Sequence, residues 1–205
     1  KRDRESEENE AIQVLMKAYA ATKNYRLKMR ADEIRIRQLN RQARQIAAKG
    51  DRAAAQRHLA KQLSFELAVY KERVQNYPTD NRLKFEYARR LFTARKWDEA
   101  IPVFQEARND PKHHVACNVY IGRCFLEKRY YAQAVDAFRE AVRNYQIEGD
   151  EQSKEMHYWL GRALEAEGKL EEAAKVYGQV IQWDYNYKDV RARLDAIREG
   201  KKATS

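Results

Sequence analysis

The 205-residue sequence has few residues that interrupt helices, with only seven Gly and three Pro. Gly and Pro are the residues least favourable inside an α-helix, so their scarcity favours a mostly helical protein. Charged residues make up 35% of the chain and hydrophobic residues 43%. A chain of this length and composition can form one or two domains with a hydrophobic core.

Cysteine is also scarce, and Cys117 and Cys124 are the only two. They lie two turns apart in one helical pattern, about 10 Å by helix rise, which is too far for a disulfide. We therefore expect two free thiols in the core and a reducing, cytoplasmic setting. The sequence starts without Met, which is compatible with a piece of a longer protein.

Several signatures of other protein classes are missing. No apolar run approaches the ~18 residues of a membrane span, and no hydrophobic signal segment is present. Phosphate-binding Gly-rich loops and the hydrolase and zinc-protease motifs are absent as well. The four histidines, His58, His113, His114 and His157, show no metal-ligand spacing. We expect no integral membrane segment in this chain, no cofactor, no metal, no catalytic residues and no enzymatic activity.

Positive charge is unevenly distributed. The net charge is +10, and residues 23–57 hold eleven Lys or Arg against three acidic residues. Such a segment can be a solvated or protein-contacting helix face, a nucleic-acid surface, or a patch for anionic membranes. We favour the first alternative, because the segment has no recognised nucleic-acid reader motif.

Three stretches of the chain repeat one order of small and bulky residues. A small residue is followed by a bulky one at +3, Ala at +12, an aromatic at +16 and Ala or Val at +19. The sets are Ala88, Leu91, Ala100, Phe104 and Ala107; Gly122, Phe125, Ala134, Phe138 and Ala141; and Gly161, Leu164, Ala173, Tyr177 and Val180. We infer paired helices that cross at the small residues, with the aromatic filling the space between neighbouring pairs.

This pattern resembles the tetratricopeptide repeat (TPR) family. In the family register the copies span 81–114, 115–148 and 154–187, with a five-residue insertion before the third. The turn glycine of the family remains only as Gly168. The resemblance implies an all-α, right-handed superhelical solenoid of helical hairpins. We expect residues 188–205 to form an amphipathic capping helix and a tail.

The N-terminal region, residues 1–80, is expected to be a long helical hairpin. Residues 5–49 contain no Gly or Pro and are interpreted as one long helix with an imperfect heptad pattern. A second helix is expected over 51–77, ending before Pro78, and Tyr70, Val74 and Pro78 fit a degenerate repeat. A long polar helix is not stable alone. It therefore folds back on 51–77 or self-associates with another chain, and we favour the intramolecular hairpin.

The TPR resemblance also implies that the first helix of each hairpin lines a concave groove. Position 9 of the repeat is Arg in all three copies, and Arg donates forked, charge-assisted bonds to carboxylates. The expected groove residues are Phe85, Arg89, Phe92, Val119, Arg123, Leu126, Tyr158, Arg162 and Glu165. In the alternative, the arginines pair internally with Glu86, Glu127 or Glu165. A chaperone-tail clamp needs Asn at two positions that hold Arg89 and Tyr120 here.

We therefore expect a non-catalytic scaffold or adaptor that binds a partner protein or acidic peptide in this groove. The alternative is a nucleic-acid-associated protein that uses residues 23–57. A salt-dependent interaction with oligonucleotides would distinguish the second hypothesis from the first.

Overall fold

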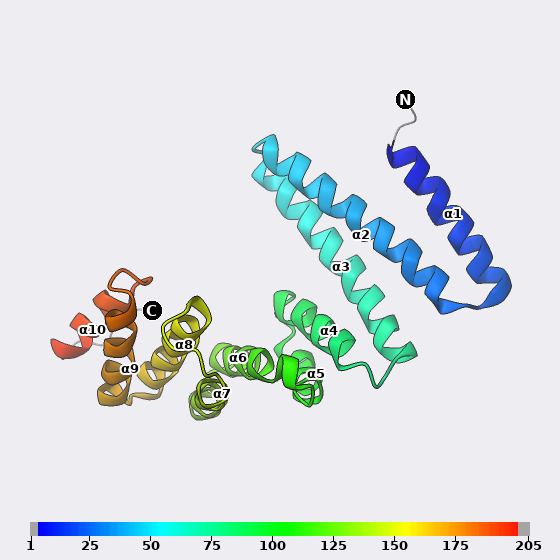
Figure 1. Cartoon of the computed structure of the whole chain (residues 1–205). Helices are drawn as coiled ribbons and strands as arrows, with labels where there is room; N and C mark the ends of the chain where they lie inside the picture. Colours follow the sequence, from blue (N-terminus) through cyan, green and yellow to red (C-terminus); the bar gives the residue numbers. More distant parts are fainter. Residues whose placement is uncertain (1–3, 201–205) are drawn as a thin grey trace. The chain divides into compact units, whose positions relative to one another are not determined.

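The computed structural model describes residues 4–200, and every regular element in that range is an α-helix (Figure 1). The helices are α1 (Arg4–Thr22), α2 (Tyr25–Ala48), α3 (Arg52–Asn76), α4 (Asn81–Thr93), α5 (Trp97–Ala107), α6 (Pro111–Glu127), α7 (Tyr131–Arg143), α8 (Glu151–Glu167), α9 (Leu170–Trp183) and α10 (Val190–Arg198). The all-α fold class is confirmed. Residues 1–3 of the expected hairpin and 201–205 of the expected tail lie outside the described range.

The chain divides into two compact units, Lys1–Leu83 and Lys84–Ser205, which we describe separately. The domain boundary expected after residue 80 lies three residues before this division. In the first unit, α1, α2 and α3 run antiparallel in succession, and α2 contacts both of the others (Figure 1).

The prediction of one helix over residues 5–49 was wrong, because the structure has two helices there. The hydroxyl of Thr22 donates to the carbonyl of Ala18 at 2.8 Å, and Lys23 adopts a left-handed backbone with φ of 56°. The side chain of Asn24 then caps α2 by accepting from the N–H of Arg26. Local hydrogen bonds make this break without Gly or Pro.

The core of the first unit is thin and partly polar. Its buried apolar side chains on α2 and α3 are accompanied by the buried polar residues Asp32, Gln38 and Arg73. Burial raises the pKa of Asp32, although the Lys28 ammonium lies 3.5 Å from its Oδ2. The buried apolar residues on these helices are Tyr25, Ala31, Ile34, Leu39 and Val69.

The second unit is a stack of the hairpins α4–α5, α6–α7 and α8–α9, closed by α10 (Figure 1). The repeated small residues lie at the helix crossings as expected. A Cβ added to Gly122 would lie 2.8 Å from the Phe138 ring, and one added to Gly161 would lie 2.3 Å from the Tyr177 ring. The repeated Ala at +12 and the aromatic at +16 are fully buried; these are Ala100, Ala134, Ala173, Phe104, Phe138 and Tyr177.

The turn inside each hairpin keeps the same backbone although only one copy has Gly. Arg95, Arg129 and Gly168 have φ of 57°, 61° and 88° at equivalent positions. The N–H of the following residue bonds back across each turn, for example from Lys169 to the carbonyl of Leu164 at 2.8 Å. This is the left-handed helix end that Gly favours. Two arginines adopt it here at a cost of roughly 1–2 kcal/mol each.

The five-residue insertion lengthens the loop between α7 and α8. In this loop Gly149 has φ of 76°, and the Tyr145 hydroxyl donates to Asp150 at 2.5 Å. Asp150 also caps α8 by accepting from the N–H of Ser153 at 2.7 Å. The cap explains why α8 begins three residues before the position 154 expected for the third repeat.

The last helix covers the end of the stack, as expected for a capping helix. α10 packs against α9, and its residues Val190 and Leu194 are almost completely buried. The buried face spaces its residues at i and i+4, and the remaining positions are largely polar. The apolar end of the α8–α9 hairpin is therefore shielded from water.

Candidate functional site

The nine residues expected to line a groove all lie on α4, α6 and α8, the first helices of the three hairpins. Each helix supplies three of them, at the same positions of its repeat. The residues are Phe85, Arg89 and Phe92 on α4; Val119, Arg123 and Leu126 on α6; and Tyr158, Arg162 and Glu165 on α8. Their environments differ, and Arg123 on the middle helix has the most distinctive one.

Arg123 lies between aromatic rings supplied by both neighbouring hairpins. Its guanidinium carbon is 4.7 Å from the ring centroid of Phe92 on α4 and 4.8 Å from that of Trp159 on α8. Tyr120, one turn earlier on α6, is 5.8 Å away. No carboxylate of the described residues lies within 4.0 Å of this guanidinium. Stacking uses the faces of the cation, so its in-plane N–H donors remain available to a ligand.

The other two arginines have polar partners of their own. Arg89 is exposed and pairs with Glu86 at 3.2 Å, as the internal-pairing alternative proposed. Arg162 donates from Nη1 to the Tyr158 hydroxyl at 3.2 Å. An ion pair as accessible as Arg89–Glu86 contributes little to stability, so it does not prevent Arg89 from turning to a partner. The contact of Arg162 is part-buried, because Tyr158 is a core residue.

Glu165 is occupied by internal contacts. Its carboxylate accepts from the Arg193 guanidinium at 3.0 Å and from the Tyr177 hydroxyl at 2.9 Å. The side chains of Glu165 and Arg193 are only 10% and 8% exposed. Burial, with the adjacent Glu165 carboxylate, raises the pKa of Tyr177. The structure therefore assigns Glu165 to holding α10 on the stack, a role that the groove expectation did not include.

Two of the expected aromatic contacts are largely buried by packing. Phe85 stacks on His113 with ring centroids 4.6 Å apart and is 9% exposed, and Tyr158 is 6% exposed. The sequence interpretation missed Trp159, and it considered Tyr120 only as a departure from the chaperone clamp. Both occupy position 6 of their repeats, one turn before the groove Arg, and that register is the signal that could have identified them.

Two hollows lie along the helices α6 and α8, and Arg123 lines the smaller of them. One has a volume of about 410 Å³ and is lined by Val119, Tyr120, Arg123 and Met156 among others. The second, about 770 Å³, is lined by residues that include Leu126, Trp159, Arg162 and Arg193. Concave sites with apolar walls and a few polar groups are typical of ligand binding. The smaller hollow fits this description better, because many charged side chains line the larger one. The size of both hollows suits side chains of a peptide.

The two cysteines are core residues, as expected. Cys117 and Cys124 are free and buried, and burial raises the pKa of each thiol to about 12. A thiol with such a pKa is a poor nucleophile at neutral pH. The described part of the chain contains no group of three or more His, Cys, Asp and Glu placed to hold a metal ion. Among its helices none is both long and apolar enough to cross a membrane.

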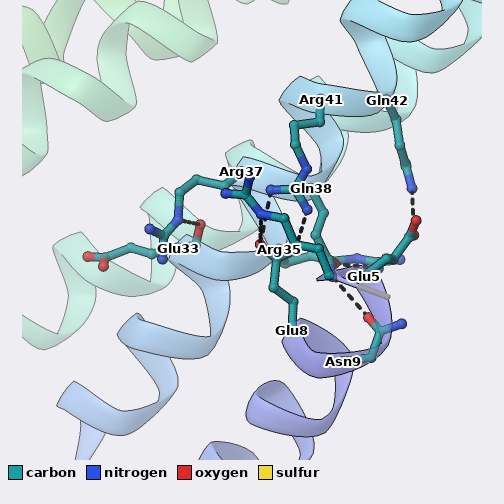
Figure 2. Close-up of polar contacts among 10 residues, drawn as sticks. Glu5, Glu8, Asn9, Glu33, Arg35, Arg37, Gln38, Arg41 and Gln42 are labelled. Atoms are coloured by element: carbon teal, nitrogen blue, oxygen red, sulfur yellow. Dashed lines mark hydrogen bonds and ion pairs between the residues drawn. The ribbon is translucent and has the colours of Figure 1, made fainter. Parts of the chain in front are cut away.

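The basic segment 23–57 covers α2 and the start of α3. Part of its charge is neutralised inside the first unit, where Arg41 pairs with Glu8 of α1 (Figure 2). Further along, the end of α2 and the start of α3 present exposed cations. For these cations no carboxylate of residues 4–200 lies within 4.0 Å; they are Arg44, Lys49, Arg52, Arg57 and Lys61.

Comparison with known proteins agrees with the repeat pattern. The family model described as tetratricopeptide repeat matches residues 85–146 and, overlapping them, 121–186. No curated protein sequence matches the chain closely enough to be counted as a relative.

Several solved structures share the fold. A structure of MamA 41-end from Desulfovibrio magneticus RS-1 has a TM-score of 0.58 at 15% identity, covering 82% of this chain and 86% of that one. Another MamA crystal structure has a TM-score of 0.62 at 14% identity, covering 71% of this chain and 82% of that one. The first TPR of Spaghetti (RPAP3), bound to the HSP90 peptide SRMEEVD, has a TM-score of 0.51 at 21% identity. The match covers 58% of this chain and 94% of that one. At such identities the likeness concerns the fold.

Proposed function

Since the chain belongs to the tetratricopeptide repeat family, we propose that it is a non-catalytic scaffold that holds a partner protein or peptide against α4, α6 and α8. The observation that carries this proposal is Arg123. Its guanidinium contacts the rings of both Phe92 and Trp159, and it borders a hollow of about 410 Å³. An Arg held in this way loses little side-chain entropy on binding, which favours its use as an anchor.

The ligand that fits this surface is an acidic peptide with an apolar side chain for the hollow. Two carboxylates line the hollow, and both already have partners: Glu155 accepts from the Trp159 indole at 3.2 Å, and Glu151 pairs with Lys154 at 3.1 Å. The Arg123 donors would therefore be satisfied by ligand carboxylates. The Spaghetti domain has an HSP90 peptide in its structure. Because this chain lacks the Asn residues of the chaperone clamp, we propose a different acidic sequence as its ligand.

Replacing Arg123 with Glu is expected to weaken binding of the tightest peptide found in an acidic peptide array by at least about tenfold, because attraction becomes like-charge repulsion. The affinity is measured by fluorescence polarisation with the 205-residue chain, and SRMEEVD serves as a reference peptide. The matched control is Arg143→Glu, an equal charge change at an exposed position of α7. Equal affinities for wild type and Arg123→Glu would contradict the groove assignment.

A second candidate function is nucleic-acid binding by the tip of the α2–α3 hairpin. The observation in its favour is the group of exposed cations that ends with Arg57 and Lys61, for which the described residues supply no carboxylate. Clustered cations of this kind neutralise phosphates and release counterions.

For this candidate, the triple change Lys49→Glu, Arg52→Glu and Arg57→Glu is expected to abolish retardation of a labelled single-stranded oligonucleotide at about 50 mM salt. The wild-type chain should lose affinity steeply as salt is raised, since each phosphate contact adds about 0.7 to the salt slope. The matched control reverses three exposed cations of the second unit, Arg143, Lys175 and Arg198. Absence of any retardation of the wild-type chain at low salt would exclude this function.

A further inference from the structure

The connection between α1 and α2 is a two-residue hinge whose conformation is costly for its sequence. Lys23 has φ of 56°, a left-handed conformation that a side chain with a Cβ rarely adopts. Asn24 holds the bend by capping α2, and its own N–H bonds to the Thr22 hydroxyl at 3.2 Å. No Gly or Pro occurs in residues 5–49, so an uninterrupted helix is also accessible to this segment.

The contact of α1 with α2 includes hydrogen bonds and an ion pair between side chains of complementary charge (Figure 2). Gln38 donates to Asn9 at 3.0 Å, and Arg41 donates from Nη1 to Glu8 Oε1 at 3.0 Å. An acidic start of α1 thereby faces the basic second half of α2. The same bonds can form whether α1 and α2 belong to one chain or to two copies of it.

α1 gains little from burial in its present place. It contributes no buried residue to the first unit, and Val14 and Met16 are 62% and 37% exposed. Within the described residues, α1 packs appreciably on α2 alone. A helix that has no fully buried residue, packs on one neighbouring helix and is joined to it by a strained hinge can leave that interface at low cost.

We propose that α1 also docks on α2 of a second copy of this chain, forming an exchanged dimer. In this dimer Lys23 and Asn24 become helical, so residues 4–48 form one helix. Two such helices lie antiparallel, and each α1 meets the α2 of the other copy. Every α1–α2 contact is retained and the left-handed backbone of Lys23 is relieved in each chain, which is the situation in which short strained hinges favour exchange. A second copy is the occupant because it alone supplies this same acidic helix.

Charge reversal tests the exchange directly. Alone, a Glu8→Arg chain and an Arg41→Glu chain each place like charges across the α1–α2 contact. Mixed together, they restore opposite charges only when α1 of each chain docks on α2 of the other. Native mass spectrometry of the full chains, with one carrying a mass tag, should show the mixed dimer at least about tenfold above its statistical share. Absence of the mixed dimer overturns the proposal.

The chain with both changes is the matched control, because it restores opposite charges within one molecule. It should match wild type in its monomer–dimer equilibrium. Its mixed dimers with either single variant should not exceed their statistical share. Indiscriminate dimers among all four chains would show association through another surface and would overturn the proposal. Circular dichroism of each variant confirms that helical content is retained, so an unfolded chain cannot imitate a negative result.

The hinge supplies an independent test. Lys23→Gly accepts a left-handed backbone without cost, and it should raise the dimer dissociation constant by about tenfold or more in sedimentation measurements. Lys23→Ala combined with Asn24→Ala removes the cap and should shift the chain toward the dimer. If wild type and both hinge variants were monomeric at every concentration, exchange at this hinge would be contradicted. Equal dimer dissociation constants for the two hinge variants would contradict it as well.

Discussion

Replacing Gly161 with Ala is expected to lower the free energy of unfolding by about 2–3 kcal/mol. The added Cβ would lie 2.3 Å from Cε1 of Tyr177, well inside van der Waals contact. The ring cannot swing away easily, since Tyr177 is fully buried and its hydroxyl donates to Glu165 at 2.9 Å. The gain in helix propensity from Gly to Ala, at most about 1 kcal/mol, is too small to offset the displaced ring.

Gly178 is the matched control for this change, because it lies inside the neighbouring helix α9. A Cβ added at Gly178 has no heavy atom within 4 Å. Gly178→Ala is therefore expected to raise the stability by about 0.5–1 kcal/mol through helix propensity alone. Urea unfolding followed by circular dichroism measures both variants. Equal or greater stability of Gly161→Ala relative to wild type would show that the hairpins do not need a small residue at this crossing.

The hairpins could be predicted from the sequence because side-chain size at a crossing is a local and repeated property. Gly122 and Gly161 can each be identified by offset alone, and their close approach to an aromatic ring follows from that spacing. The turns inside the hairpins were harder to predict from the sequence. Arg95 and Arg129 adopt the left-handed conformation in which a Gly was expected, because the packing of the two helices fixes the turn whatever its residue.

The break between α1 and α2 could not be inferred from helix breakers. It depends on hydrogen bonds of Thr22 and Asn24, and both residue types also occur within helices. The heptad pattern is interrupted at Thr22, the last residue of α1, but it is also interrupted at Asp32 inside α2, so an interruption does not by itself locate the break. Whether the chain forms a hairpin or one long helix depends on the hydrogen bonds of Thr22 and Asn24 and on the backbone strain at Lys23, which oppose each other.

The positions of the candidate site residues in the fold were predicted in part. Repeat register placed the three arginines on the first helices, but the sandwich around Arg123 depends on Trp159 from the next hairpin, 36 residues later. Glu165 is satisfied by Arg193, which lies 28 residues further along the chain on α10. Contacts between successive elements depend on how the stack curves, and no offset within one repeat encodes them.

The Glu165–Arg193 pair gives the largest expected effect, a loss of about 3–5 kcal/mol for Arg193→Ala. The Nη1 of Arg193 lies 3.0 Å and 3.2 Å from the two carboxylate oxygens of Glu165, and its Nε donates to Asp189 at 2.8 Å. Both side chains of the pair are at most 10% exposed. Removing the guanidinium leaves a carboxylate that is only 10% exposed without its cation, and α10 loses its polar attachment to α8.

The double change Glu165→Leu with Arg193→Met separates charge from packing. If the loss in Arg193→Ala comes from an uncompensated charge, the apolar pair should recover most of it, less about 1 kcal/mol for the Tyr177 hydroxyl, which loses its acceptor. Lys96→Ala is the exposed control: its pair with Glu99 has side chains 49% and 56% exposed, and the change should cost less than about 0.5 kcal/mol. Urea unfolding measures all three variants. A loss for Arg193→Ala no larger than that for Lys96→Ala would mean that the cap is held by Val190 and Leu194 alone.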